Sequence, residues 1–269
     1  MTISSVDPTC PPEFILLAHR LADAAGAVAR RYFRTPVRVE DKPDQSPVTI
    51  ADREAEKAMR VLLAEAVPGH GILGEEWGLE NTDAEWVWVL DPIDGTKAFI
   101  TGKPSFGTLI ALRHHGRAVL GMIDQPILGE RWLGAAGQPT VLNAQPIRTR
   151  ACDRLGLATL YATSPDMFSG ADATAWRTLA GRVKLVRYGA DCYAYGLLAA
   201  GFVDLVVEAS LHPYDWGPMA PIIEGAGGII TDWLGRALTP DSDGRVVAAG
   251  DRATHAAALE ALAQGSLAG

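Results

Sequence analysis

One stretch of the chain, residues 86–106, constrains the fold and the chemistry more than any other. It opens with Trp86–Leu90, an apolar run rich in aromatic and β-branched residues, which is typical of a buried β-strand. The run stops at Asp91, and Pro92 fixes φ and has no backbone N–H, so we expect the chain to leave the sheet there. A second acid, Asp94, follows. The sequence predicts two carboxylates on a tight turn at the end of a buried strand.

The residues around this turn indicate metal-assisted phosphate chemistry. Two neighbouring carboxylates repel each other unless a cation or a proton lies between them. Gly95 allows the backbone to approach a ligand closely, and a helix beginning near Thr96 would offer free N–H groups to an anion. Acidic groups for a metal beside amides for a phosphate suit metal-assisted hydrolysis of a phosphate ester.

The bulk properties exclude several other classes of function. The chain has 269 residues, of which 48% are hydrophobic and 21% charged, which is enough for a sizeable globular core. The net charge of −8 disfavours nucleic-acid or anionic-membrane partners. The three cysteines are widely spaced, which argues against a disulfide framework and fits a reducing cytoplasm. We see no signal peptide and no apolar run of roughly 20 residues that could span a membrane.

Hydrophobic periodicity predicts two different halves. The first half is expected to hold helices over 13–33 and from Thr49 to about Val67, a strand over 72–74, the central strand, and an antiparallel meander over 105–114, 117–124 and 131–136. The second half alternates expected strands over 156–163, 183–188, 202–208, 228–232 and 246–249 with helices over 171–180, 191–200, 216–226 and 252–263. We expect residues 138–150 to cross between an N-terminal domain, 1–144, and a C-terminal domain, 145–269. His114 and His115 are expected as solvated residues at the tip of the meander, without partners at zinc-ligand spacing.

Four blocks of residues carry a family resemblance. The hexapeptide Asp91–Thr96 resembles the signature of the inositol monophosphatase superfamily. Its other blocks are matched, in the family's order, by Ser46–Asp52, by Gly74–Glu76, and by Tyr214–Trp216 followed by Glu224–Gly228. The resemblance implies an α+β fold with layers in the order α-β-α-β-α, a homodimer, and a metal-dependent phosphomonoesterase acting on a small-molecule phosphomonoester.

The acidic residues in these blocks favour a hard cation. Oxygen ligands without histidine or cysteine select Mg²⁺, with Mn²⁺ as a possible substitute. The resemblance implies two or three ions: Glu75, Asp91 and the Ile93 carbonyl would hold one, Asp91, Asp94 and Asp215 a second, and Glu75 with waters a third. Adjacent residues of a strand point to opposite faces, so we expect Glu75 as a direct ligand and Glu76 behind it.

The resemblance also implies how water attacks phosphorus. Metal-activated water would be oriented and deprotonated by Thr96 together with Asp52 or Glu76, while the backbone N–H groups of Gly95 and Thr96 hold phosphate oxygens. The residues themselves leave other roles open. Asp52 lies in the first turn of a helix, where a carboxylate favours the helix dipole, and Asp215 could cap the helix that follows it.

Several segments resemble the histidinol-phosphate phosphatase branch of the superfamily. They are Thr101–Leu112, Ile123–Pro126, Glu130–Trp132 and Gly189–Tyr195, and Lys97-Ala98-Phe99 also departs from the ordinary inositol phosphatase pattern. Histidinol phosphate is cationic, so Asp191 and Glu208 could pair with its basic groups. Asp191 could instead cap a helix, and Lys97 could contact phosphate or be solvated.

The resulting hypothesis is a Mg²⁺-dependent phosphomonoesterase that converts L-histidinol phosphate to L-histidinol. The alternatives are an inositol or broad sugar monophosphatase and a catalytically silent binding member of the family. A phosphatase for 3′-phosphoadenosine 5′-phosphate is disfavoured, because the chain shows no obvious adenine-binding insertion.

Overall fold

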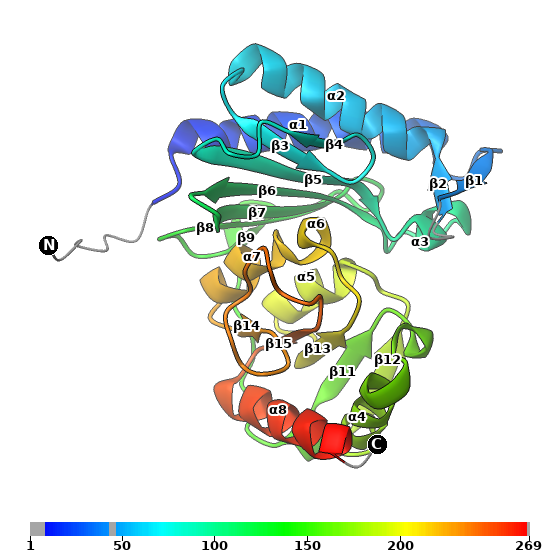
Figure 1. The fold of residues 1–269 in the computed structure, drawn as a ribbon, viewed down its shortest axis with the longest axis vertical. Coiled ribbons are helices and arrows are strands. Elements are labelled where there is room, and N and C mark those ends of the chain that lie inside the picture. Colours follow the sequence, from blue (N-terminus) through cyan, green and yellow to red (C-terminus); the bar gives the residue numbers. More distant parts are fainter. Residues whose placement is uncertain (1–8, 43–46, 268–269) are drawn as a thin grey trace, which may run out of the picture.

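Five layers make up the molecule, and they follow the predicted order α-β-α-β-α (Figure 1). The computed structural model describes residues 9–42 and 47–267, so most of the expected N-terminal tail and residues 43–46, including Ser46, lie outside it. From top to bottom in Figure 1 the layers are the helices α1 and α2, an eight-stranded sheet, the short helices α5, α6 and α7, a five-stranded sheet, and the helices α4 and α8. The helices are α1 (Pro12–Tyr32), α2 (Ile50–Ala66), α3 (Thr96–Ile100), α4 (Gly170–Ala180), α5 (Tyr193–Ala199), α6 (Pro213–Trp216), α7 (Met219–Gly225) and α8 (Arg252–Leu267).

The eight-stranded sheet contains the predicted meander. Its spatial order is β10-β9-β8-β7-β6-β5-β3-β4, and all its neighbours are antiparallel except β3 and β5. The strands are β3 (Gly71–Gly74), β4 (Gly78–Glu80), β5 (Trp86–Asp94), β6 (Gly107–His114), β7 (Arg117–Gln125), β8 (Glu130–Ala135), β9 (Val141–Leu142) and β10 (Gln145–Pro146). A separate hairpin pairs β1 (Val39–Asp41) with β2 (Pro47–Thr49). The expected crossover over 138–150 therefore contains two short strands of this sheet, and the domain boundary near residue 144 stays a prediction.

The predicted end of β5 at Asp91 is wrong. The strand continues to Asp94, with Asp91 paired to Leu109 and Asp94 to Gly107, and the register shifts between the two acids. A bulge accommodates Pro92, which cannot donate to the ladder but accepts a hydrogen bond from Thr108 Oγ1 at 2.9 Å. The bulge lies between Asp91 and Asp94, whose carboxylates come close together at this end of the sheet.

The five-stranded sheet has the order β12-β11-β13-β15-β14. Its strands are β11 (Thr159–Ala162), β12 (Leu185–Tyr188), β13 (Leu205–Glu208), β14 (Ile229–Thr231) and β15 (Val246–Ala249), and two 3₁₀ turns, η1 (Leu155–Leu157) and η2 (Pro165–Met167), flank β11. Strand β11 is parallel to β12 and β13, as the alternation of strands and helices indicates, whereas β15 is antiparallel to both its neighbours. The helix expected over 216–226 is α7, which begins three residues later than predicted, and a separate short helix, α6, precedes it.

The middle layer of helices packs closely on the eight-stranded sheet. A Cβ atom at Gly121 of β7 would lie 1.9 Å from the Pro218 carbonyl oxygen, and one at Gly134 of β8 would lie 2.3 Å from the Pro221 oxygen. Only glycine permits this approach of backbone to backbone. The buried core there joins Trp132 of the first sheet to Tyr195 and other residues of the middle layer. This packing fixes α6, which carries Asp215, against the sheet that carries Asp91 and Asp94.

Candidate active site

Three buried or half-buried acids meet where β5 and α6 approach each other. Asp91, Asp94 and Asp215 each place a carboxylate oxygen within 4.8 Å of the other two. Burial, followed by repulsion from neighbouring acids, raises the pKa of Asp91 and of Asp94 well above its ordinary value, and burial raises the pKa of Asp215 to about 7. When they are ionised, these carboxylates repel one another unless a cation lies between them. The donor set consists of oxygens alone, so it fits a hard divalent ion.

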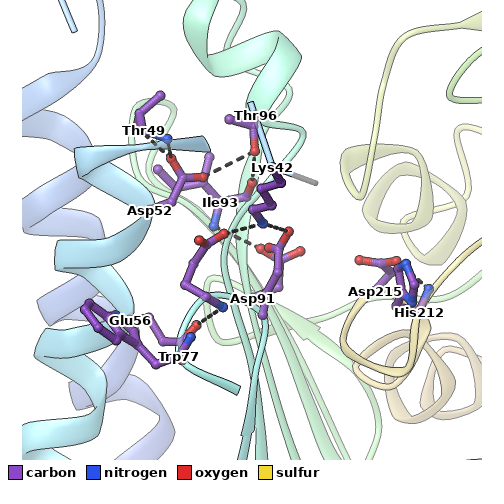
Figure 2. Close-up of polar contacts among 12 residues, drawn as sticks. Lys42, Thr49, Asp52, Glu56, Trp77, Asp91, Ile93, Thr96, His212 and Asp215 are labelled. Atoms are coloured by element: carbon purple, nitrogen blue, oxygen red, sulfur yellow. Dashed lines mark hydrogen bonds and ion pairs between the residues drawn. The ribbon is translucent and has the colours of Figure 1, made fainter. Parts of the chain in front are cut away.

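The turn after β5 is held by its own side chains. Asp91 Oδ1 accepts a hydrogen bond from the Ile93 backbone N–H at 3.1 Å, and Thr96 Oγ1 lies 3.2 Å from both the Ile93 carbonyl oxygen and Asp52 Oδ1 (Figure 2). Gly95 has φ +82°, a left-handed conformation that favours glycine, and it precedes α3 as predicted. The predicted catalytic pair of Thr96 and Asp52 is thus in contact.

Asp52 combines its two alternative roles. It is the third residue of α2, and its Oδ2 accepts hydrogen bonds from the N–H and the hydroxyl of Thr49 at 2.8 and 2.6 Å, which completes a capping box. Its other oxygen lies toward Thr96. Burial raises the pKa of Asp52 even though the hydrogen bonds from Thr49 oppose the shift. The helix cap therefore fixes a buried carboxylate beside the site.

Lys42 is a cation of the site that the sequence did not indicate. Its Nζ donates to Glu75 Oε1 at 2.7 Å and to Glu76 Oε1 at 2.6 Å. The strand ends at Gly74, and the chain turns through residues 75–77, so both glutamates can reach the same ammonium group. Glu75 remains beside β5, because its N–H donates to the Leu90 carbonyl at 3.1 Å, and its charge raises the pKa of Asp91.

Glu56 is the second residue that sequence reasoning missed. It is fully buried on α2 and accepts hydrogen bonds from the backbone N–H groups of Glu76 and Trp77 at 2.7 and 3.2 Å, which shapes the turn that carries the two glutamates (Figure 2). The sequence does contain a pattern that could have revealed Glu56. It lies four residues after Asp52, on the helix face that buries Met59 and Leu63. An acid within an apolar stripe indicates a buried partner.

Asp215 precedes the helix α7, as the sequence predicts, and it also lies inside a short helix, α6, that the sequence did not predict. It is the third residue of α6, and its Oδ2 accepts a hydrogen bond from the His212 backbone N–H at 2.6 Å. Figure 2 shows it approaching from the side opposite α2. Asp215 therefore caps a helix and belongs to the acid cluster at the same time.

A pocket opens beside this cluster and brings together residues from both halves of the chain. Among those that line it are eight with predicted roles: Glu75, Asp94, Gly95, Thr96, Lys97, Asp191, Glu208 and Asp215. The two halves are linked directly, because the Cys192 backbone N–H donates to Asp94 Oδ2 at 2.7 Å. Glu76 is not among the lining residues, and neither is Asp91. The strand alternation expected for Glu75 and Glu76 is wrong, because both lie in the turn after β3, and the ligand role of Glu75 stays a prediction.

Asp191 does not cap the helix that follows it. The residue before α5 is Cys192, and no side chain caps that helix. The Asp191 carboxylate instead accepts a hydrogen bond from Ser105 Oγ at 3.1 Å, and its Cγ lies 2.8 Å from where a Cβ of Gly95 would be. Burial raises the pKa of Asp191, and the nearby ammonium groups of Lys103 and Lys97 oppose that shift. Asp191 therefore presents a carboxylate beside the turn predicted to bind phosphate.

Glu208 lines the same pocket, is buried and is already hydrogen-bonded. Its Oε1 accepts from the backbone N–H and the hydroxyl of Thr163 at 2.8 and 2.6 Å, and its Oε2 accepts from the Tyr195 hydroxyl at 3.0 Å. Burial raises its pKa. These bonds fix the carboxylate in the wall of the pocket.

The layered fold and this buried, all-oxygen acid cluster define a metal-dependent phosphomonoesterase. The model of the inositol monophosphatase family matches residues 12–267, and the chain belongs to that family. It is 51% identical over 268 residues to the bifunctional phosphatase IMPL2, chloroplastic, of Arabidopsis thaliana, covering 96% of this chain and 78% of that protein. It is 35% identical over 237 residues to the histidinol-phosphatase of Chlorobaculum parvum, covering 86% and 90%.

A solved structure of an inositol monophosphatase from Zymomonas mobilis is similar throughout. Its TM-score is 0.86 at 49% sequence identity, with 93% of this chain and 98% of that chain covered. Among the helices that the structure describes, none is long and apolar enough to cross a membrane.

Proposed function

We propose that the protein hydrolyses L-histidinol phosphate to L-histidinol and phosphate. The observation that carries the proposal is the Asp191 carboxylate, which lies in the pocket directly beside Gly95 and so next to the expected position of the phosphate. Histidinol phosphate has an ammonium group and an imidazole, and a carboxylate at this place pairs with such a group. Relatives named histidinol-phosphatase support the same substrate.

The metal would be held by the acid cluster. Glu75, Asp91, Asp94, Asp215 and the Ile93 carbonyl are the proposed ligands for two or three Mg²⁺ ions, with Mn²⁺ as a substitute. When bound, these ions polarise the phosphate and lower the pKa of water, which is the chemistry that two-metal phosphatases use.

The chain's own residues would hold the phosphate and move the proton. Thr96 Oγ1 can pass its proton toward Asp52 Oδ1, 3.2 Å away, and then accept one from the attacking water. Burial raises the pKa of Asp52, which makes its carboxylate a stronger proton acceptor than an exposed one. Glu76 would serve through Lys42 and Glu75 as a positioning residue, and the N–H groups of Gly95 and Thr96, with Lys97, would bind phosphate oxygens.

A substrate panel tests the proposal. Phosphate release would be measured from L-histidinol phosphate, inositol 1-phosphate, fructose 1,6-bisphosphate and 3′-phosphoadenosine 5′-phosphate, each with Mg²⁺ and with a chelator. We expect Mg²⁺-dependent release with the highest kcat/KM for histidinol phosphate. No release from any substrate would instead support the silent binding member.

An Asp191→Asn variant then tests the observation itself. Loss of a charge-assisted hydrogen bond, about 1.5–3 kcal/mol, should lower kcat/KM for histidinol phosphate about 10- to 100-fold and that for inositol 1-phosphate much less. Asp172→Asn, which removes a carboxylate on α4 paired with Arg245, is the matched control. An equal loss on both substrates would show that Asp191 is structural.

Inositol monophosphate is the second candidate substrate. The similar Zymomonas mobilis protein is named an inositol monophosphatase, and the Arabidopsis relative is named bifunctional. If the panel favours inositol 1-phosphate, the proposed metal site is kept and the proposed role of Asp191 in substrate recognition is rejected.

We also propose that the protein is a homodimer and lies in the cytoplasm. Sedimentation of the protein with Mg²⁺ tests whether it is a homodimer.

A further inference from the structure

A second cluster of potential ligands lies at the opposite end of β5 from the acid cluster. It consists of Glu85, just before β5, and of His114 and His115, at the end of β6. Trp86 and His114 are cross-strand partners in the ladder, whereas Asp94 pairs with Gly107 at the other end of the same two strands. At about 3.3 Å per residue, the two ends are roughly 25 Å apart. The cluster is separate from the proposed active site.

The tight turn between β6 and β7 brings the two imidazoles together. His114 pairs with Arg117, which leaves a two-residue loop, and both loop residues have positive φ: His115 +48° and Gly116 +81°. This is the backbone pattern of a type I′ hairpin turn, which favours Asn-Gly over a histidine at its first position. The rings of His114 and His115 lie 4.3 Å apart between centroids. A less favourable residue thus occupies the position that places a second imidazole beside the first.

Glu85 completes a set of three ligand atoms. Its Oε1 lies 2.8 Å from His114 Nε2 and 3.9 Å from His115 Nε2, and its backbone oxygen accepts a hydrogen bond from the His115 N–H at 3.0 Å. One ligand atom from each residue lies within 4.8 Å of the others. Ligands 2.0–2.1 Å from a tetrahedral zinc ion are about 3.3 Å apart, so movements of about 1 Å would suffice. Glu85 and His115 are more than half exposed and can move that far.

Trp86 holds one of the ligands in place. Its ring stacks on His114 with centroids 4.0 Å apart and planes at 21°. A fixed first imidazole lowers the entropy that must be lost when the other two side chains close on an ion.

We propose that Glu85, His114 and His115 bind a divalent transition-metal ion of the zinc class. Two imidazoles and one carboxylate, with the remaining coordination open to water, suit Zn²⁺ and disfavour Mg²⁺, which prefers oxygen ligands. The expectation that these histidines lack partners is wrong, because Glu85 comes from a turn 29 residues before His114 and no local spacing reveals it. The ion would clamp the β6–β7 hairpin to the start of β5.

The turn chemistry supplies a variant that should fold well. His115→Asn creates the Asn-Gly pair that a type I′ turn prefers, so it should keep or raise the stability of the zinc-free protein while removing a ligand. His114→Gln in the same chain removes the second imidazole. His19→Asn is the matched control, because His19 lies on α1 beside Arg131, outside the cluster.

The experiment is a Zn²⁺ titration of the full chain with Mg²⁺ in excess, followed by calorimetry and by thermal unfolding. We expect the wild type and His19→Asn to bind one more equivalent of Zn²⁺ than His114→Gln/His115→Asn, and to show a zinc-dependent rise in Tm that the double variant lacks. Equal zinc stoichiometry, or an equal rise in Tm, in the wild type and the double variant would overturn the proposal.

Discussion

The buried carboxylate of Glu56 accepts a hydrogen bond from the backbone N–H of Glu76 at 2.7 Å. The same side chain binds the Trp77 N–H and pairs with Arg60 Nε at 2.8 Å. Gly74 makes room for it, because a Cβ there would lie 2.0 Å from Glu56 Oε1. One helix residue therefore sets the turn that places Glu75 beside Asp91.

Replacement of Glu56 should destabilise the protein and weaken Mg²⁺ activation. Glu56→Ala leaves the part-buried N–H groups of Glu76 and Trp77 and the Arg60 Nε without this acceptor, which should lower the free energy of unfolding by about 2–3 kcal/mol. Urea unfolding and the Mg²⁺ dependence of activity measure the two effects. The control is Glu54→Ala, which removes another carboxylate of α2. Its partner, Arg31 of α1, is exposed, so the free energy of unfolding should fall by about 0.5 kcal/mol or less. Similar losses in both variants would contradict the role given to Glu56.

Neutralising Asp94 should separate activity from stability. Asp94→Asn removes a proposed metal ligand, so activity should fall about 100-fold or more. The chelated variant should unfold at the same temperature as the chelated wild type or higher, because one of three repelling charges is gone. The Asn side-chain oxygen can still accept from the Cys192 N–H. Wild-type turnover in this variant would reject the metal assignment.

The metal-free protein should lose stability as pH rises toward neutrality. Burial raises the pKa of Asp215 and that of Glu76 to about 7, whereas carboxyl groups of the unfolded chain titrate near 4. Between about pH 4 and 7 the folded state therefore binds more protons than the unfolded state, and the free energy of unfolding falls with rising pH. Above about pH 7 the contribution stays constant.

Urea unfolding in chelator, from pH 5 to 8, measures this dependence. Asp215→Asn should become more stable relative to the wild type as pH rises through the window, and Mg²⁺ should reduce that difference at pH 8. A difference between the two proteins that does not change with pH would show that Asp215 titrates at an ordinary pKa.

How well the sequence predicted the site depends on how local each feature is. The acids around β5 could be predicted, because a buried strand and the turn after it lie within a few residues of one another. Lys42 could not, because its partner Glu75 lies 33 residues further along the chain, beyond β2, α2 and β3. The five layers followed from the family resemblance, but the continuation of β5 past Pro92 depends on Thr108 of the neighbouring strand.

The close contact between the first sheet and the middle layer gives a further prediction. Gly121→Ala would force its methyl group into the Pro218 backbone and should lower the free energy of unfolding by about 3 kcal/mol, with a loss of activity as α6 shifts. Gly69→Ala, where a Cβ meets nothing within 4 Å, should change it by about 0.5 kcal/mol or less. Thermal unfolding of both variants measures the two effects. If Gly121→Ala is as stable as Gly69→Ala, the sheet and the middle layer of helices can move apart to admit the methyl group.

The acid cluster draws Asp91 and Asp94 from the first half of the chain and Asp215 from the second half. A chain in which either half has opened retains only part of the cluster. An ion bound by all three acids therefore raises the free energy of every partial opening that separates the halves, while it leaves openings within one half unchanged. Metal occupancy thereby makes unfolding more cooperative, and the active site reports whether both halves of the molecule are folded together.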